Sequence, residues 1–116
     1  ESPSAEPSQS ATPTKKPQAK AVVRILQAVA DSASGNIQVI AEVADISEDG
    51  GTCTLKVTQG AVTRSVTAKA ESNVTDTQCY PLNLAIAGFA TGPASFTVTY
   101  DSADYTGSVS DQVSIP

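Results

Sequence analysis

Residues 50–60 read GGTCTLKVTQG, and this stretch gives the clearest indication of the fold. After its glycines the side chains alternate, with Cys53, Leu55 and Val57 on one face and Thr54, Lys56 and Thr58 on the other. A period of two is the pattern of a β-strand that buries one face and exposes the other to water. The stretch also holds one of only two cysteines in the chain, which raises the question of what Cys53 does.

The same period of two recurs in six further segments on both sides of this stretch. They are residues 21–30, 36–44, 61–70, 79–86, 95–100 and 105–115, separated by turns rich in Gly, Asp, Ser and Asn. No segment of useful length shows the period of a helix. We therefore predict an all-β fold, an antiparallel β-sandwich of about seven strands.

Three segments depart from simple alternation. The clustered apolar residues of 22–26 predict a first strand that bends or shifts faces midway. Arg64 shares a face with the valines of its strand, which predicts an edge strand, because a charged side chain there discourages pairing with other chains. Pro81 cannot donate a hydrogen bond to a neighbouring strand, so we predict it at the start of its strand or on an edge.

The first twenty residues, ESPSAEPSQSATPTKKPQAK, differ in composition from the rest. They contain four prolines and no apolar residue larger than Ala. Such a segment cannot bury enough surface to offset the entropy lost on ordering, and its prolines favour an extended chain. We predict that residues 1–20 form a disordered linker and that residues 21–116 form one β-sandwich domain, for which this length is usual.

Charge and hydropathy exclude several classes of protein. The chain has seven basic and twelve acidic side chains, a net charge of -5, and no basic cluster in its folded part. Nucleic acid is therefore not an expected partner. No apolar run approaches the ~18 residues that a membrane span needs. The chain begins at Glu1 rather than Met, and we expect a signal or anchor segment before it. Together these features predict an extracellular protein, secreted or held at the cell surface.

The two cysteines, Cys53 and Cys79, are interpreted as a disulfide. A catalytic thiol needs a base, normally His, and the chain has none. Structural zinc needs four ligands, and two sulfurs without histidine fall short. Both cysteines are predicted near the starts of their strands at one end of the molecule, where a bridge would tie the two sheets together. A pair of free thiols is the remaining alternative.

Two acidic turns are the candidate metal sites. Asp45, Glu48 and Asp49 lie in one turn, and Asp101 and Asp104 lie in another. Calcium takes six to eight oxygen ligands and often uses carboxylates from adjacent loops. Asp and Gly are also ordinary turn-forming residues, and the sequence does not say whether the two turns meet. We predict no metal site and no cofactor.

Few other residues point to chemistry. Tyr80 and Tyr105 are candidates for stacking on a carbohydrate, with packing at the core or its rim as the simpler interpretation. Asn73 begins NVT, which is an acceptor sequence for N-glycosylation. The carboxylates fall in turns or on outward strand positions, and no Ser with a base is visible. We therefore do not expect an enzyme.

Residues 82–115 resemble the immunoglobulin-like and fibronectin type III-like modules of bacterial surface and secreted proteins. The apolar Ile86 and Phe89 lead to a Gly-Pro corner, and the aromatic-x-Val-x-aromatic strand Phe96 to Tyr100 follows. The chain departs from antibody-type domains because it has no Trp and because its two cysteines are not separated by most of the domain.

This resemblance implies recognition, spacing or assembly rather than catalysis, and the fold does not specify which. We expect a non-catalytic extracellular module for cell-surface display, adhesion, spacing or subunit assembly, with a protein or glycan partner at the cell surface. The alternative is a carbohydrate-binding module of a secreted enzyme, with residues 1–20 as the interdomain linker. Exposed aromatic side chains on one face would favour that alternative.

Overall fold

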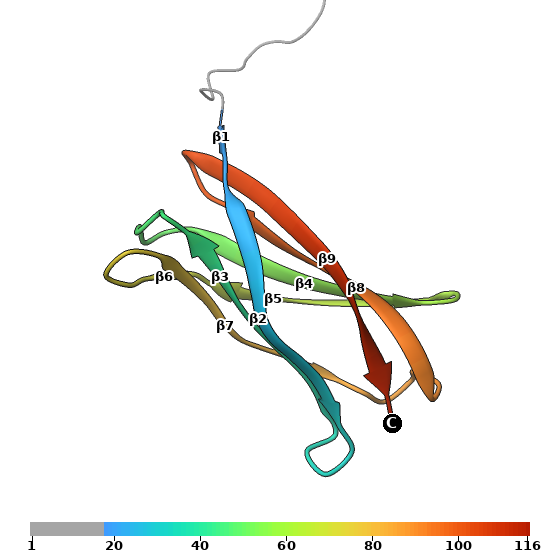
Figure 1. The fold of residues 1–116 in the computed structure, drawn as a ribbon. Coiled ribbons are helices and arrows are strands. Elements are labelled where there is room, and N and C mark those ends of the chain that lie inside the picture. The colour runs from blue at the N-terminus through green and yellow to red at the C-terminus, as the bar shows by residue number, and fades with distance from the viewer. Residues whose placement is uncertain (1–17) are drawn as a thin grey trace, which may run out of the picture.

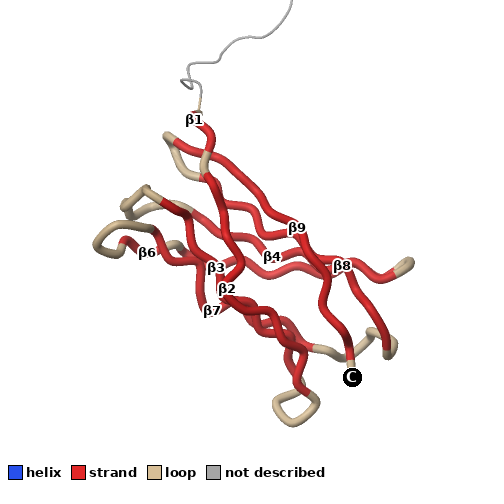
Figure 2. Tube along the Cα trace, in the orientation of Figure 1, coloured by secondary structure: helices blue, strands red, loops and turns tan. Residues whose placement is uncertain are grey.

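The computed structural model describes residues 18–116, apart from the side chains of Tyr80 and Pro81, and shows two β-sheets packed face to face (Figure 1, Figure 2). Across the first sheet the strands are β1 (Ala19–Lys20), β9 (Tyr105–Ile115), β8 (Gly92–Asp101), β4 (Thr52–Gln59) and β5 (Val62–Lys69). Across the second they are β2 (Val22–Asp31), β3 (Asn36–Ala44), β7 (Thr77–Ala85) and β6 (Glu71–Ser72). Residues 18–116 contain no helix that could cross a membrane.

The predicted number of strands is wrong, because the described residues form nine rather than about seven. The seven longer strands correspond to the seven segments with a period of two. The others, β1 and β6, have two residues each, which is too short for alternation to reveal them. β1 also runs parallel to β9, with Ala19 opposite Tyr105, so the first sheet is mixed rather than purely antiparallel.

The folded part begins earlier than the predicted boundary after Lys20. Ala19 and Lys20 form β1, and the Gln18 side-chain amide donates hydrogen bonds to Asp101 Oδ1 at 2.7 Å and to the Ser102 carbonyl at 2.5 Å. These contacts fasten the incoming chain to the β8–β9 hairpin. Residues 1–17 of the predicted linker lie outside the described residues.

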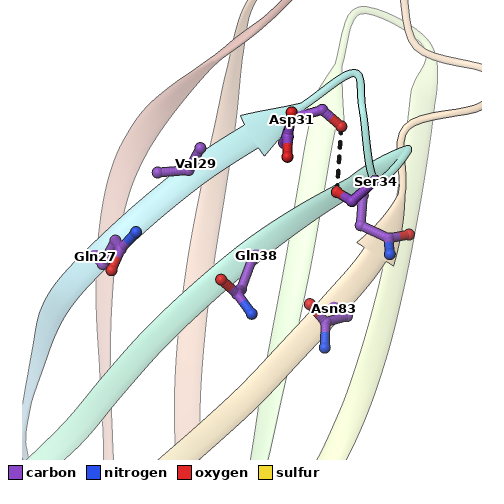
Figure 3. A pocket seen from close by; sticks show the side chains of 7 residues that line it. Gln27, Val29, Asp31, Ser34, Gln38 and Asn83 are labelled. Carbon is purple, nitrogen blue, oxygen red and sulfur yellow. Dashed lines mark hydrogen bonds between the residues drawn. The ribbon is translucent and has the colours of Figure 1, made fainter.

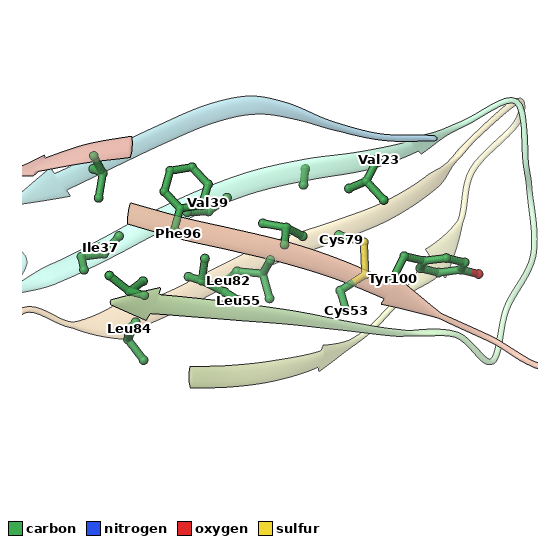
Figure 4. Close-up of a cluster of buried hydrophobic side chains, with 14 of the residues drawn as sticks. Val23, Ile37, Val39, Cys53, Leu55, Cys79, Leu82, Leu84, Phe96 and Tyr100 are labelled. Atoms are coloured by element: carbon green, nitrogen blue, oxygen red, sulfur yellow. A yellow bond between two sulfur atoms is a disulfide. The ribbon is translucent and has the colours of Figure 1, made fainter. Parts of the chain in front are cut away.

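The core lies between the two sheets and confirms the predicted inward faces (Figure 4). Tyr100 and Phe96 are its largest fully buried side chains. The other inward positions of the regular strands are buried as well: Ile37, Val39, Ala41, Val43, Cys53, Leu55, Val57, Leu82, Leu84 and Val98. Burying each larger apolar side chain stabilises the fold by roughly 1.5–3 kcal/mol, so this inner layer supplies most of the driving force.

β2 shifts faces midway, as its apolar cluster predicts. The register between β2 and β3 changes between Ile25 and Gln27, which leaves Leu26 as an extra residue in a β-bulge. Val23 is buried, whereas Leu26 is 55% exposed. The bulge lets both halves of β2 turn small or branched side chains inward, because one added residue reverses the alternation.

A second bulge accommodates Pro81 in β7. Val39 pairs with Leu82 and Ala41 pairs with Cys79, so Tyr80 and Pro81 together lie opposite one residue of β3. β6 pairs only with Thr77 and Gln78, so β7 is an edge at the proline. The prediction of an edge position for Pro81 is thus confirmed, and the bulge removes the need for its missing donor.

β5 is an edge strand of the first sheet, as the position of Arg64 predicts. Arg64 lies over the ring of Phe89, with its guanidinium carbon 6.0 Å from the ring centroid. This distance is at the limit of a cation–π contact. The arginine therefore both charges the edge and covers the corner that leads from β7 to β8.

The loops gather at two opposite ends of the sandwich (Figure 1). Thr52 at the start of β4 pairs with Asp101 at the end of β8, and Val43 pairs with Thr77, so the loops 45–51, 73–76 and 102–104 share one end with β1. We call this the N-terminal end. The loops 32–35, 60–61 and 86–91 lie at the other end together with Pro116, which we call the C-terminal end.

Candidate functional site

Cys53 and Cys79 form a disulfide, and the predicted pairing is confirmed. Cys53 lies on β4 in the first sheet and Cys79 lies on β7 in the second, with a Cα–Cα distance of 5.7 Å (Figure 4). Both side chains are fully buried. The bond joins the two sheets through the core near the N-terminal end, and it leaves no free cysteine in the described part of the chain.

The two acidic turns do lie at the same end of the sandwich, but they do not form a metal centre among residues 18–116. No group of three or more His, Cys, Asp or Glu side chains is placed there to hold a metal ion. Asp45 occupies a left-handed turn position with a φ of 62°, a conformation that Asp tolerates. These residues therefore fit the turn-forming interpretation.

Three of the acidic candidates are engaged in hydrogen bonds that shape the N-terminal end. Asp49 Oδ1 accepts a hydrogen bond from the Ser72 backbone N–H at 3.0 Å, which lowers the pKa of Asp49. Glu48 accepts a hydrogen bond from the Tyr100 hydroxyl, and Asp101 accepts one from the Gln18 amide. The Asp104 backbone N–H donates to the Ser102 hydroxyl. The bonds of Asp49, Glu48 and Asp101 each tie a turn to a distant part of the chain, whereas the bond of Asp104 stays within its own turn.

Tyr100 links the core to the loop 45–51. Its ring is fully buried and its hydroxyl donates a hydrogen bond to Glu48. Burial, assisted by the bond to Glu48, raises the pKa of Tyr100 to about 12. The phenol therefore stays protonated at neutral pH and acts as a donor rather than as a base. The sequence places Tyr100 in the core but cannot indicate Glu48 as its partner.

Thr77 fixes the same loop from the second sheet. This threonine is completely buried, and its hydroxyl donates to the Ile46 carbonyl at 2.5 Å and accepts from the Glu48 backbone N–H at 3.3 Å. A buried hydroxyl that both donates and accepts is satisfied without water. The loop 45–51 is thus held from both sheets, which makes it a rigid connection.

Of the two aromatic candidates for carbohydrate stacking, Tyr105 is the one whose side chain the structure describes. Tyr105 is only partly exposed and packs against the core, as its rim interpretation predicts. The side chain of Tyr80 lies outside the described residues, and its backbone forms part of the bulge in β7. Asn73, the potential glycosylation acceptor, lies in an exposed loop beside Val74, which is 90% exposed.

A groove of about 390 Å³ lies on the outer face of the second sheet, towards the C-terminal end (Figure 3). It is lined by Gln27, Val29, Asp31, Ser34, Asn36, Gln38 and Asn83. These residues come from β2, β3, β7 and the turn between β2 and β3. The alternation of residues 36–44 predicts that the outward positions of this strand, Gln38 among them, face solvent. The only signal that could have drawn attention to them is the repeated choice of carboxamides.

A second hollow of about 470 Å³ lies between the β4–β5 turn and the loop that leads into β8. The amide of Gln59 spans it, since its Nε2 donates to the Ala90 carbonyl at 2.8 Å and its Oε1 accepts from the Ala90 N–H at 2.7 Å. The remaining lining is mostly glycine, alanine and proline. The Gln59 amide is thus already hydrogen-bonded to the loop, and we assign this hollow a structural role.

In comparisons with known proteins, no family model matches the chain, and no curated protein or solved structure matches it significantly. What the structure establishes is therefore the coarser level of the predicted resemblance. The described residues form an all-β sandwich of two sheets that are joined by a disulfide.

Proposed function

We propose that this chain is an immunoglobulin-like module with a non-catalytic role outside the cell, in surface display, adhesion, spacing or subunit assembly. The order of its strands supports the family assignment. Named A to G in chain order from β2, with β5 as C′, the second sheet reads A-B-E-D and the first reads G-F-C-C′, with the short β1 added beside G. This is the arrangement of immunoglobulin domains, apart from the disulfide, which joins C to E instead of B to F.

The observation that carries the spacing role is the placement of the two chain ends. The chain enters the sandwich through β1 at the N-terminal end, and Pro116 lies at the opposite end, where its carbonyl accepts a hydrogen bond from the Thr91 hydroxyl (Figure 1). The described part has principal extents of 55 × 38 × 17 Å. Because the two ends of the described part lie at opposite ends of the sandwich, the domain would hold whatever is attached to those ends apart by the length of the sandwich.

The disulfide and the composition support an extracellular location. Disulfides persist in secreted proteins and at cell surfaces, whereas cytosolic thiols are kept reduced. The partner would be a protein or a glycan at the cell surface. The alternative, a carbohydrate-binding module of a secreted enzyme, shares this location and differs in having a catalytic neighbour.

Surface labelling of the organism that makes the protein tests this proposal. Intact cells are treated with a membrane-impermeant amine-reactive biotin, for which the exposed Lys20, Lys56 and Lys69 are targets. We expect labelling before lysis, with a cytosolic protein unlabelled in the same cells, and alkylation of two cysteines only after reduction. Labelling only after lysis, or two thiols that alkylate at once, would contradict an extracellular module.

A further inference from the structure

We infer that the groove on the outer face of β2, β3 and β7 binds a neutral glycan chain. This inference rests on the proposed function, because it assigns the adhesive surface of that module and the chemistry of its partner. Of the two depressions described above, this groove has the more polar lining, and it lies away from the N-terminal end where the chain enters.

The floor of the groove is set by strand register. Val29, Gln38 and Asn83 lie opposite one another on three adjacent strands, so they form one row across the sheet (Figure 3). Gln27 lies one row towards the N-terminal end, and Asp31 pairs with Asn36 one row towards the C-terminal end. Neighbouring strands lie ~4.8 Å apart. The side chains of three strands are therefore spread over an area wide enough to contact several sugar units of a chain.

The carboxamides of the groove are available to a ligand. Among the described residues, the side chains of Gln27, Asn36, Gln38 and Asn83 make no hydrogen bond with another protein group, and three of the four residues are exposed. Each carboxamide offers two donors and an acceptor. A sugar hydroxyl is likewise both donor and acceptor, so either orientation finds a partner. These hydrogen bonds between carboxamides and sugar hydroxyls need no charge on the ligand.

An apolar contact and a rigid rim complete the groove. Val29 is 42% exposed in the middle of the carboxamides and offers an apolar surface to the C–H face of a sugar ring. The rim is held by a tight turn, in which Asp31 accepts hydrogen bonds from the backbone N–H groups of Ala33 and Gly35 and from the Ser34 hydroxyl (Figure 3). The combination resembles the few fixed polar groups around an apolar patch that orient small ligands.

The charge of the groove favours a neutral ligand over an anionic one. Its lining contains the Asp31 carboxylate and no lysine or arginine. Arg24, on the same strand, is already paired with Glu42 at 2.7 Å. A phosphate or uronate group would meet a carboxylate without a cation to offset the repulsion. Glycans built from uncharged hexoses or N-acetylhexosamines avoid this cost.

The position of the groove favours a glycan over a peptide. An extended peptide gains much of its affinity by adding a strand to an open sheet edge. The groove lies on the face of the sheet, where the backbone groups of β3 are paired with both β2 and β7. Recognition on this face must come from side chains, and it has no deep apolar pocket for an anchoring residue.

A nuclear magnetic resonance titration of the full chain tests the inference. The probes are the hexasaccharides of cellulose, chitin, β-mannan and amylose, each added to about 10 mM, roughly ten times a dissociation constant of 1 mM. We expect one or more probes to shift the side-chain NH₂ resonances of Gln38 and Asn83. The NH₂ resonance of Gln112, an exposed glutamine on β9 of the other sheet, should not move.

Three variants separate a specific site from general effects. Gln38→Ala and Asn83→Ala should each weaken binding about 3- to 10-fold, because each removes a neutral hydrogen-bonding group. Gln112→Ala is the matched control and should bind as the unaltered protein does. All three residues are exposed, so the variants should fold.

Several outcomes would overturn the inference. The first is the absence of any shift in the groove with all four probes, and the second is equal weakening by Gln112→Ala. Shifts confined to the backbone of the β2 edge on addition of an extended peptide would point to a protein partner instead. Each result leaves the extracellular location untouched, because the labelling of intact cells is an independent measurement.

Discussion

The ring of Tyr100 lies directly over Gly51, so closely that no side chain fits between them. A Cβ atom built on Gly51 would lie 2.5 Å from both Cε1 and Oη of Tyr100. The same hydroxyl donates its hydrogen bond to Glu48, three residues before this glycine. The buried tyrosine therefore sets the path of the loop 45–51, and several consequences of this packing can be measured.

Gly51→Ala should destabilise the domain by about 1–3 kcal/mol, because the methyl group must displace a buried ring. Urea unfolding followed by circular dichroism measures the loss. The control is the same substitution in a Tyr100→Leu background, where no phenol ring opposes the methyl group and the added cost should fall. An equal cost in both backgrounds would show that the contact with Tyr100 is not its cause.

Deprotonation of Tyr100 should make the stability of the domain fall at high pH. The unfolded chain loses this proton near pH 10.0, whereas the folded state keeps it until about pH 12. The contribution is therefore complete below pH 10.0 and is lost as the pH rises through about 12. Unfolding in urea at a series of pH values measures this decline. Tyr100→Phe should show a smaller decline, and an unchanged slope would argue against Tyr100 as its source.

The double substitution Cys53→Ala and Cys79→Ala should lower the free energy of unfolding by ~3.5 kcal/mol, because the bond closes a loop with a sequence separation of 26. Urea unfolding with and without a reducing agent provides the comparison. Reductant should destabilise the unaltered protein by a similar amount and have no effect on the double variant. If the reductant also destabilised the double variant, its effect on the unaltered protein could not be assigned to the Cys53–Cys79 bond.

Gln59→Ala should free the loop that leads into β8. The lost amide donates to the Ala90 and Pro93 carbonyls and accepts from the Ala90 N–H. We expect faster hydrogen exchange at the Ala90 amide and a loss of roughly 1–3 kcal/mol. Gln112→Ala, on the exposed face of β9, is the comparison and should leave the exchange unchanged. Unchanged exchange in both variants would show that the loop does not depend on Gln59.

Much of the fold follows from local pattern. The alternation in residues 36–44 and 52–58 determined which side chains point inward, because a strand exposes successive residues to opposite faces whatever it pairs with. The apolar cluster at the start of β2 and the charge of Arg64 likewise indicated a bulged strand and an edge strand. The absence of histidine made a disulfide the best use of the two cysteines.

Other features depended on the folded arrangement. β1 and β6 are strands only because longer strands lie beside them, since two residues have no period of their own. Tyr100 and Glu48 are 52 residues apart in sequence and meet because β4 and β8 are neighbours. Pairings between distant strands are selected by how the whole chain buries its apolar surface, which a single strand does not encode.

The candidate site divides in the same way. The alternation of their strands is enough to predict that Gln38 and Asn83 face water. That they lie opposite each other and beside Val29 depends on the sheet order and on the two bulges, which set the register. The groove is formed by side chains of three strands, so it exists only when β2, β3 and β7 are paired in this register.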